Sequence, residues 1–224
     1  MTTARFPWAL VTFDIDGTLT KGHGWEAIAR AFDRLDAYRA TQARFAAGEI
    51  GEDDHLGNLL SLVAGRTEAE LDAVLAATPK IAGISEGVRA LRGRGARVAL
   101  LTHNPAVVCR WYAATFGFDE FEGAPGPEPV DGRLPPTGAV RADKVGQLRR
   151  LLGRLSIDPR RTVHVGDSRS DAEVFSRIGG GVALNSPIGP VRDGADLVAD
   201  VEDLRELVPA LGAMRPRVGT LRSM

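Results

Sequence analysis

Short apolar runs followed by glycine, aspartate or asparagine recur along the chain, at residues 8–13, 98–101, 162–165 and 182–184. Runs of this length without alternation are typical of strands that are buried on both faces of a parallel sheet. Between them lie stretches with helical spacing, at residues 87–91, 107–116, 145–155 and 172–178. This order predicts an α/β fold, a doubly wound, Rossmann-like parallel sheet.

Residues 25–77 interrupt the alternation. Alanine, leucine and charged residues fill helical patterns there without a β-branched run, which predicts a small all-helical cap inserted after the first strand. Thr67 and Glu70 match a capping box that begins a helix, and Pro79 ends the insert. We therefore expect a core at residues 1–20 and 81–214 and a cap at residues 21–80.

Two further segments lack regular patterning. Residues 123–138 are rich in proline and glycine and carry an Asp131-Gly132 turn signal, which predicts an irregular excursion with a hairpin, with a plain surface loop as the alternative. From Met214 on there is no apolar periodicity, so residues 215–224 are expected to form a flexible tail.

Composition narrows the class of protein. The 224 residues are 44% hydrophobic and 25% charged, as in ordinary globular proteins, and the length suits one domain or a core with a small insert. The formal net charge of -1 offers no summed field for nucleic acid or an anionic membrane. No apolar run approaches the ~20 residues of a spanning helix. We expect neither a nucleic-acid nor a membrane partner.

The N-terminus and the cysteine content bear on location. The first 14 residues carry an early arginine and too short an apolar stretch for a signal peptide. Cys109 is the only cysteine, so an intramolecular disulfide is excluded and a reducing compartment is favoured. We predict a cytoplasmic location, in a monomer or a homodimer.

Polar residues gather after the predicted strands. They are Asp14, Asp16 and Thr18 after the first, Thr102, His103 and Asn104 after the second, and Asp167 and Asp171 after the third, while Lys144 begins a helix. The carboxyl ends of parallel strands meet at one edge of the sheet, so these groups can converge. An aspartate and a glycine after a strand can also form a simple turn, but the combined set predicts a phosphoryl-transfer site.

Each group suits a role in that chemistry. A carboxylate can attack phosphorus and form an acyl phosphate, and Asp14 is the expected nucleophile, with Asp16 as the general acid and base. Lys144 and a hard divalent cation, Mg²⁺, would offset the negative charge. The expected metal ligands are Asp14, Asp16, Asp167 and Asp171, although Asp171 can instead orient Lys144 or the waters of the metal. The hydroxyls of Thr18 and Thr102 and the amide of Asn104 are expected to bind phosphate oxygens.

These motifs resemble the haloacid dehalogenase (HAD) superfamily. The DxDGT pattern at residues 14–18, Thr102, Lys144 and the GDxxxD pattern at residues 166–171 occur in the order of that superfamily. The helical insert is similar to that of its phosphoserine phosphatase group. The resemblance implies a magnesium-dependent phosphatase, because the second aspartate, here Asp16, is absent from the dehalogenases and transport ATPases of the superfamily.

The substrate side departs from the phosphoserine phosphatase group. His23 occupies the place of a glutamate that meets the substrate amino group there, and Leu59 lies at or near an arginine that binds the substrate carboxylate. His103 follows Thr102 where glycine is usual, and Ser170 replaces an asparagine. We therefore expect another small phosphomonoester, a sugar, polyol or nucleoside phosphate, with phosphoserine kept open, and we expect His23 and His103 to contact it.

Alternatives remain for several residues and for the activity. His164 is expected to be structural and His55 to be a solvated cap residue. Helical spacing assigns Trp25, Phe32, Phe45 and Leu56 to packing between the cap helices, with the lining of a substrate pocket as the alternative. The same aspartyl-phosphate could serve a phosphomutase or phosphotransferase. A non-catalytic phosphate-binding module is also possible on such a fold.

Overall fold

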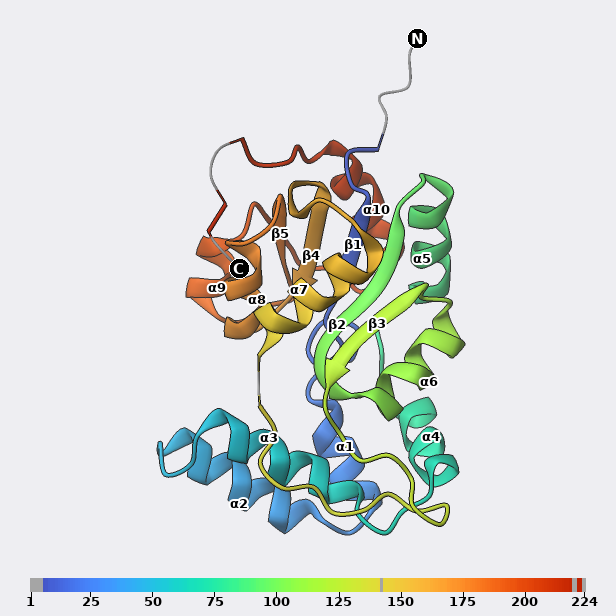
Figure 1. Cartoon of the computed structure of the whole chain (residues 1–224), viewed down its shortest axis with the longest axis vertical. Coiled ribbons are helices and arrows are strands. Elements are labelled where there is room, and N and C mark those ends of the chain that lie inside the picture. Colours follow the sequence, from blue (N-terminus) through green and yellow to red (C-terminus); the bar gives the residue numbers. More distant parts are fainter. Residues whose placement is uncertain (1–5, 142, 219–220, 223–224) are drawn as a thin grey trace.

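The computed structural model describes residues 6–141, 143–218 and 221–222, and it contains one parallel sheet with the strand order β3-β2-β1-β4-β5-β6 (Figure 1). The strands are β1 (Leu10–Phe13), β2 (Arg97–Pro105), β3 (Glu120–Ala124), β4 (Thr162–Gly166), β5 (Gly180–Leu184) and β6 (Leu197–Ala199). The chain builds outward from β1 in both directions. Ligands of open α/β sheets bind at the carboxyl ends of the strands where this direction reverses, which here lies between β1 and β4.

Helices cover both faces of the sheet, so the predicted doubly wound fold is confirmed. On one face lie α5 (Ile84–Gly93), α6 (Ala106–Phe116) and α10 (Leu204–Ala213), and on the other lie α7 (Lys144–Leu155), α8 (Arg169–Phe175) and α9 (Gly189–Gly194). Successive side chains of β1 point to opposite faces. Val11 and Phe13 accordingly enter one apolar core, and Leu10 enters the other with Leu148 and Leu151 of α7.

The two strands that the sequence analysis did not predict are the edge strands of the sheet. Only Ala124 of β3 is buried, and Glu122 in this strand pairs with Arg150 and Arg154 of α7. The other edge strand, β6, has three residues that are all at least partly exposed. An edge strand has one neighbouring strand and is more exposed to solvent, so it lacks the continuous apolar run that identifies a central strand.

The insert after β1 is helical throughout residues 24–77, apart from short connections. It comprises α1 (Gly24–Ala31), α2 (Leu35–Ala46), α3 (Glu52–Leu60), the short 3-10 helix η1 (Ser61–Val63) and α4 (Glu68–Ala77). The capping box of Thr67 and Glu70 is present at the start of α4. Buried Ile28, Leu60 and Leu71 pack between these helices. The carboxyl ends of β2 and β3 point toward this cap (Figure 1).

Residues 125–141, here called the strap, run from β3 along the cap before the chain enters α7 (Figure 1). Val130 and Arg133 pair around Asp131 and Gly132, which have φ angles of 48° and 76°, so the hairpin turn is present. Farther along, Ser61 Oγ of the cap donates to the carbonyl oxygen of Thr137 at 2.6 Å. The strap, which is covalently part of the core, is therefore also hydrogen-bonded to the cap.

Arg217 lies in the segment expected to be a flexible tail. Its Nε is 2.7 Å from Oδ1 of Asp196, and its backbone nitrogen donates to the carbonyl oxygen of Gly179 at 2.8 Å. The segment is thus attached to the core at this residue.

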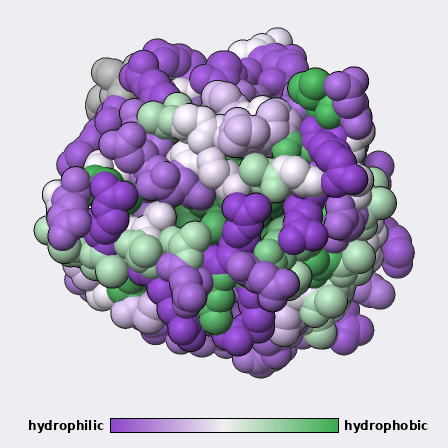
Figure 2. Space-filling view, turned by 90° about the horizontal axis from the view of Figure 1, so that it is seen from below, coloured by the Kyte–Doolittle hydropathy of each residue, from purple (hydrophilic) through white to green (hydrophobic). Residues whose placement is uncertain are grey.

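The surface seen from the cap end carries hydrophobic residues interspersed among hydrophilic ones (Figure 2). Among the described residues, no helix combines the length and the apolar character that crossing a membrane requires.

Candidate active site

A cavity of about 410 Å³ lies between the carboxyl ends of the strands and the cap. The core lines it with Asp14, Asp16, Thr102, His103, Asn104, Lys144, Asp167, Ser168 and Ser170, and the cap side lines it with His23, Trp25, Tyr38, Gln42, Phe45, Glu52, His55, Leu56 and Leu59. The cavity thus brings together most of the polar residues that the sequence analysis singled out. Thr18 and Asp171 lie behind its wall, fully buried.

Lys144 begins α7 and is buried between two carboxylates. Its Nζ lies 3.2 Å from Oδ1 of Asp14 and 2.6 Å from Oδ1 of Asp171. Burial alone would lower the pKa of Lys144, but the charges of Asp14 and Asp171 raise it above its ordinary value. The ammonium therefore stays charged and holds Asp14 in place.

Asp171 supports this lysine from behind. Its Oδ1 also accepts from His164 Nε2 at 2.8 Å, and its Oδ2 accepts from the hydroxyl of Ser168 at 2.6 Å and from the backbone nitrogen of Asp167 at 3.1 Å. Burial raises the pKa of Asp171, but Lys144 and His164 outweigh burial and lower it. Both oxygens are occupied by donors, so of the two roles expected for Asp171 the geometry favours the orientation of Lys144.

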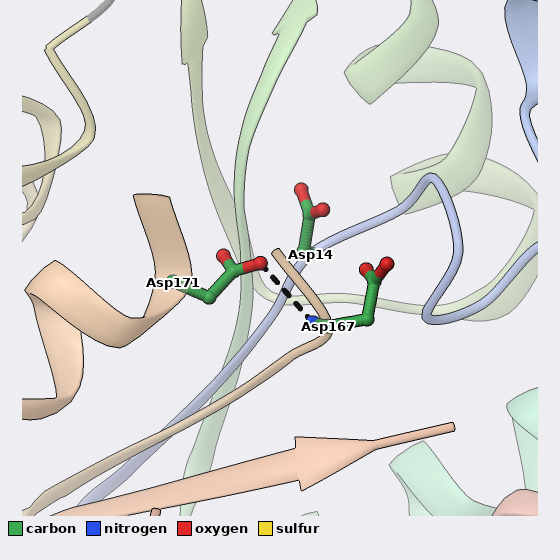
Figure 3. A group of neighbouring side chains, drawn as sticks. All are labelled: Asp14, Asp167 and Asp171. Carbon is green, nitrogen blue, oxygen red and sulfur yellow. Dashed lines mark hydrogen bonds between the residues drawn. The ribbon is translucent and has the colours of Figure 1, made fainter. Parts of the chain in front are cut away.

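Asp14, Asp167 and Asp171 form a cluster in which one oxygen of each lies within 4.8 Å of the others (Figure 3). Burial, with the charges of Asp14 and Asp171, raises the pKa of Asp167 to about 8, and burial raises the pKa of Asp14 as well. Buried carboxylates that face one another are unfavourable unless a cation offsets their charge. Because both oxygens of Asp171 already accept hydrogen bonds, Asp14 and Asp167 are the hard oxygen donors of this set that fit a divalent cation.

Gly17 makes room for Asp167. Its φ angle is 76°, and a Cβ atom at this position would lie 2.3 Å from Oδ2 of Asp167. Any side chain would both strain the turn and displace the carboxylate. The glycine after the two aspartates is thus required by the approach of the loop after β4.

Asp16 is held by one donor from the core and one from the cap. The amide of Asn104 donates to Oδ2 at 2.9 Å, and the backbone nitrogen of Gly24, at the start of α1, donates to Oδ1 at 2.8 Å. Burial raises the pKa of Asp16, while the hydrogen bonds from Asn104 and Gly24 oppose that shift. Asp16 therefore occupies a defined position at the junction of core and cap.

The residues expected to bind substrate take different positions. Thr102 is buried and lines the cavity, but the hydroxyl of Thr18 donates to Oδ1 of Asp167 at 2.9 Å and does not line it. Thr18 therefore orients a carboxylate here. His23 lies at the exposed start of α1, at the cavity wall.

His103 faces the cap, where its Nδ1 lies 3.8 Å from Oε1 of Glu52. Its buried Nε2 has no hydrogen-bond partner among the described residues. Burial and the charge of Lys144 lower the pKa of His103 to about 3, so the ring is neutral.

Tyr38 and Gln42 line the cavity but were not found from the sequence, because their helical spacing on α2 does not show that this face meets a cavity. Phe45, on the same face, was expected to pack in the cap core, but it is 40% exposed and lines the cavity. The expectation of a solvated His55 is wrong, because its ring stacks on Phe45 with centroids 4.2 Å apart and lines the cavity. Trp25 is buried as expected and also lines the cavity.

Comparisons with known proteins agree with this geometry. The family pattern of the haloacid dehalogenase-like hydrolases matches residues 11–176. A phosphoserine phosphatase of Idiomarina loihiensis is 30% identical over 183 residues, which are 79% of this chain and 82% of that protein. A phosphoserine phosphatase of Halobacterium salinarum is 31% identical over 189 residues, with 80% of this chain and 87% of that protein covered.

Solved structures share the fold. A structure described as a phospho-aspartyl intermediate analogue of phosphoserine phosphatase superposes with a TM-score of 0.73 at 22% identity, covering 91% of this chain and 98% of that chain. A HAD-family hydrolase from Salmonella enterica serovar Typhi gives 0.79 at 18% identity, covering 89% and 69%. The chain therefore belongs to the haloacid dehalogenase-like hydrolase family, in which it resembles the phosphoserine phosphatases, and it is a phosphatase.

Proposed function

We propose that this phosphatase hydrolyses a small phosphomonoester through a covalent aspartyl-phosphate on Asp14. The observation that carries the proposal is the position of Asp14, whose carboxylate lines the cavity 3.2 Å from the buried ammonium of Lys144. Asp16, the expected acid and base, lines the same cavity. A nucleophile, a proton donor and a fixed cation therefore share one enclosed space.

In the first step an oxygen of Asp14 forms a bond to phosphorus while the bond from phosphorus to the ester oxygen breaks. Asp16 donates its proton to the departing oxygen, which leaves as an alcohol. Burial raises the pKa of Asp16 and so favours the acid form that this step needs. The products of the step are the aspartyl-phosphate and the free alcohol.

In the second step water attacks the phosphorus of the aspartyl-phosphate. Asp16, now ionised, accepts a proton from the water, and the bond from phosphorus to Asp14 breaks. Inorganic phosphate leaves and both carboxyl groups return to their initial states. The cap covers the cavity during these events and limits the access of bulk water.

We assign the cofactor as Mg²⁺, held by Asp14 and Asp167 with Asp16 nearby. A bound magnesium ion would supply Lewis-acid stabilisation of the charge on the phosphoryl oxygens. Lys144 supplies the fixed positive charge, and the hydroxyl of Thr102, which hydrogen-bonds to Asp14 here, would donate to a phosphate oxygen when substrate is bound. The backbone nitrogen and the side-chain amide of Asn104 lie 3.2 Å from Oγ1 of Thr102, which orients that hydroxyl.

Replacement of the nucleophile tests the proposal. We expect Asp14→Asn to lower phosphate release from a panel of phosphomonoesters by about three orders of magnitude with the fold retained, because an amide does not attack phosphorus. The matched control is Asp33→Asn in the cap, where asparagine suits the φ angle of 57°. Normal turnover by Asp14→Asn contradicts the assignment. Release of the alcohol with phosphate transferred to an added acceptor would identify a phosphotransferase.

The substrate and the cellular setting are proposed from the relatives and from the sequence. The relatives carry the name phosphoserine phosphatase, and phosphoserine therefore belongs in the panel. A cytoplasmic location and a monomer or homodimer stay predictions from the sequence. Cys109, on which the prediction of a reducing compartment rests, is a free and buried thiol.

A further inference from the structure

The wall that the cap presents to the cavity carries no fixed positive charge. Among the described residues that line the cavity, Lys144 is the only lysine or arginine, and it is already paired with Asp14 and Asp171. The cap adds a negative charge, Glu52, at the same cavity. The part of a substrate that extends from the phosphate toward the cap thus meets no described counter-ion for an anionic group.

A second opening adjoins the cavity, and it does not add a net positive charge. Arg169 and Lys144 line it, but so do the carboxylates of Glu52, Asp143 and Glu173. Arg169 is exposed to solvent, and the three carboxylates surround the same space. An anionic group that leaves the cavity by this route meets more negative than positive charge.

A hydrogen-bonded chain runs along α2 and α3 in this wall. Nε2 of Gln42 donates to the hydroxyl oxygen of Tyr38 at 2.9 Å, and Oε1 of Gln42 lies 2.6 Å from Nε2 of His55. Because the amide oxygen only accepts, His55 carries its proton on Nε2. Because the hydroxyl oxygen of Tyr38 accepts from Gln42, its own proton is free to be donated to a group in the cavity.

Tyr38 lines the same cavity as Asp14 and Asp16. A hydrogen-bond acceptor on the part of the substrate that extends toward the cap can therefore meet its hydroxyl. Trp25, Leu56 and Leu59 add apolar surface to the same cavity wall.

From this arrangement, and resting on the proposed phosphatase function, we propose that the cap wall selects the phosphate ester of an uncharged, hydroxyl-bearing alcohol, a sugar or polyol phosphate, over an ester that carries a carboxylate. Tyr38, positioned by Gln42 and His55, donates to a hydroxyl oxygen of the substrate. The apolar side chains of the wall contact its carbon skeleton. A carboxylate brought into this space faces Glu52 and loses its water without a counter-ion, which is unfavourable.

A matched pair of substrates tests the charge selection. Glycerol 3-phosphate and 3-phosphoglycerate share a three-carbon skeleton and differ in a hydroxymethyl group against a carboxylate. With Mg²⁺ we expect kcat/KM for glycerol 3-phosphate to exceed that for 3-phosphoglycerate by at least about tenfold. Glucose 6-phosphate and phosphoserine extend the comparison, with the sugar phosphate preferred. Equal rates, or a preference for the carboxylate-bearing esters, overturn the proposal.

The residues are tested with variants of the wall. Glu52→Gln should lower the ratio of kcat/KM for glycerol 3-phosphate to kcat/KM for 3-phosphoglycerate by about threefold. The reason is that the negative charge that repels the substrate carboxylate is removed. Asp54→Asn is the control, since it makes the same change of charge on an exposed residue of α3 that does not line the cavity. If both variants leave the ratio at its wild-type value, the role of Glu52 is wrong.

Gln42→Leu interrupts the hydrogen-bonded chain. We expect kcat/KM for glucose 6-phosphate to fall by about three- to tenfold more than kcat/KM for methyl phosphate, the effect of one lost hydrogen bond. Methyl phosphate lacks any group that could meet Tyr38, so an equal loss on both substrates would show a merely structural effect and contradict the proposal.

The outcomes separate the two levels of inference. If wild-type protein releases phosphate from none of these esters, including methyl phosphate, the proposed function itself fails. If it releases phosphate in an Asp14-dependent manner but without the expected preference, only the selection by the cap wall fails.

Discussion

Lys144 keeps its positive charge in a position where burial alone would remove it. The carboxylates of Asp14 and Asp171 lie on either side of its ammonium, and His164 and Ser168 in turn hold Asp171. The network extends to Thr12, whose hydroxyl lies 2.8 Å from Nδ1 of His164. His164 of β4 is thus connected to Asp14, the proposed nucleophile, through its hydrogen bond to Asp171 and the two ion pairs of Lys144.

Loss of this charge should affect both stability and turnover. We expect Lys144→Met to lower the free energy of unfolding by about 3–5 kcal/mol, because buried carboxylates lose their partner. Phosphate release should fall by at least about a hundredfold. Urea denaturation and steady-state kinetics measure the two effects. Lys21→Met, at an exposed lysine of the chain entering the cap, is the control and should change neither strongly. A stable, active Lys144→Met protein would refute the assigned role.

His103 makes a prediction about pH. Its pKa is about 3 in the folded protein against an ordinary value of 6.5. Between these values the unfolded chain binds the additional proton, so this residue destabilises the fold progressively as the pH falls below about 6.5. In thermal melts we expect the Tm of His103→Asn minus the Tm of wild type to be larger (more positive) at pH 5 than at pH 7.5. Parallel pH profiles for the two proteins would contradict the neutral, buried ring.

At the scale of elements, the strands differ in how far they could be predicted. The central strands β1, β2, β4 and β5 are buried and appear in the sequence as apolar runs, whereas the edge strands β3 and β6 do not. The helical character of the cap was also predictable, down to the capping box at Thr67. The contacts between the cap and the strap were not predictable. They join segments far apart in the chain and involve backbone atoms, which leave no pattern in the sequence.

Gly57 allows the strap to lie directly on α3. A Cβ atom here would be 2.2 Å from the carbonyl oxygen of Gly138 and 3.0 Å from Cα of Ala139. We expect Gly57→Ala to displace the strap, with a loss of about 1–3 kcal/mol in stability and faster proteolysis within residues 125–141. Limited proteolysis with mass spectrometry locates the cleavage.

The control for this prediction is Gly153→Ala in α7. No atom beyond its own helix and chain neighbours lies within 4 Å of a Cβ at that position, so alanine should raise stability by up to about 1 kcal/mol. If both variants are equally stable and equally resistant to protease, the strap does not depend on the close approach at Gly57.

At the scale of the whole molecule, a cation bound between core loops should stabilise the fold. Mg²⁺ at a hundredfold excess over its Kd contributes about 2.7 kcal/mol, which for a chain of this size raises Tm by about 5–10 °C relative to protein in EDTA. Thermal melts with and without Mg²⁺ measure the shift. Asp167→Asn should abolish most of it and Asp33→Asn should retain it. An undiminished shift in Asp167→Asn would place the cation elsewhere.

Sequence patterns alone predicted which polar residues converge and the core that brings them together. Parallel strands place their carboxyl ends at one edge whatever the details of packing, so Asp14, Lys144 and Asp167 could be assigned to one site before any coordinates. Local signals such as the capping box were equally informative, because they depend on neighbours in the chain.

The surroundings of those residues follow from packing in three dimensions and could not be predicted from the sequence. This packing directs the hydroxyl of Thr18 to Asp167, sets His164 behind Asp171, and makes Tyr38, Gln42 and His55 part of the cavity wall. The physical reason is that an amphipathic pattern shows which face of a helix is apolar, but not which partner that face meets. The partner is set by side-chain packing between segments distant in sequence, and in this protein that packing shapes the cavity wall that we propose contacts the substrate alcohol.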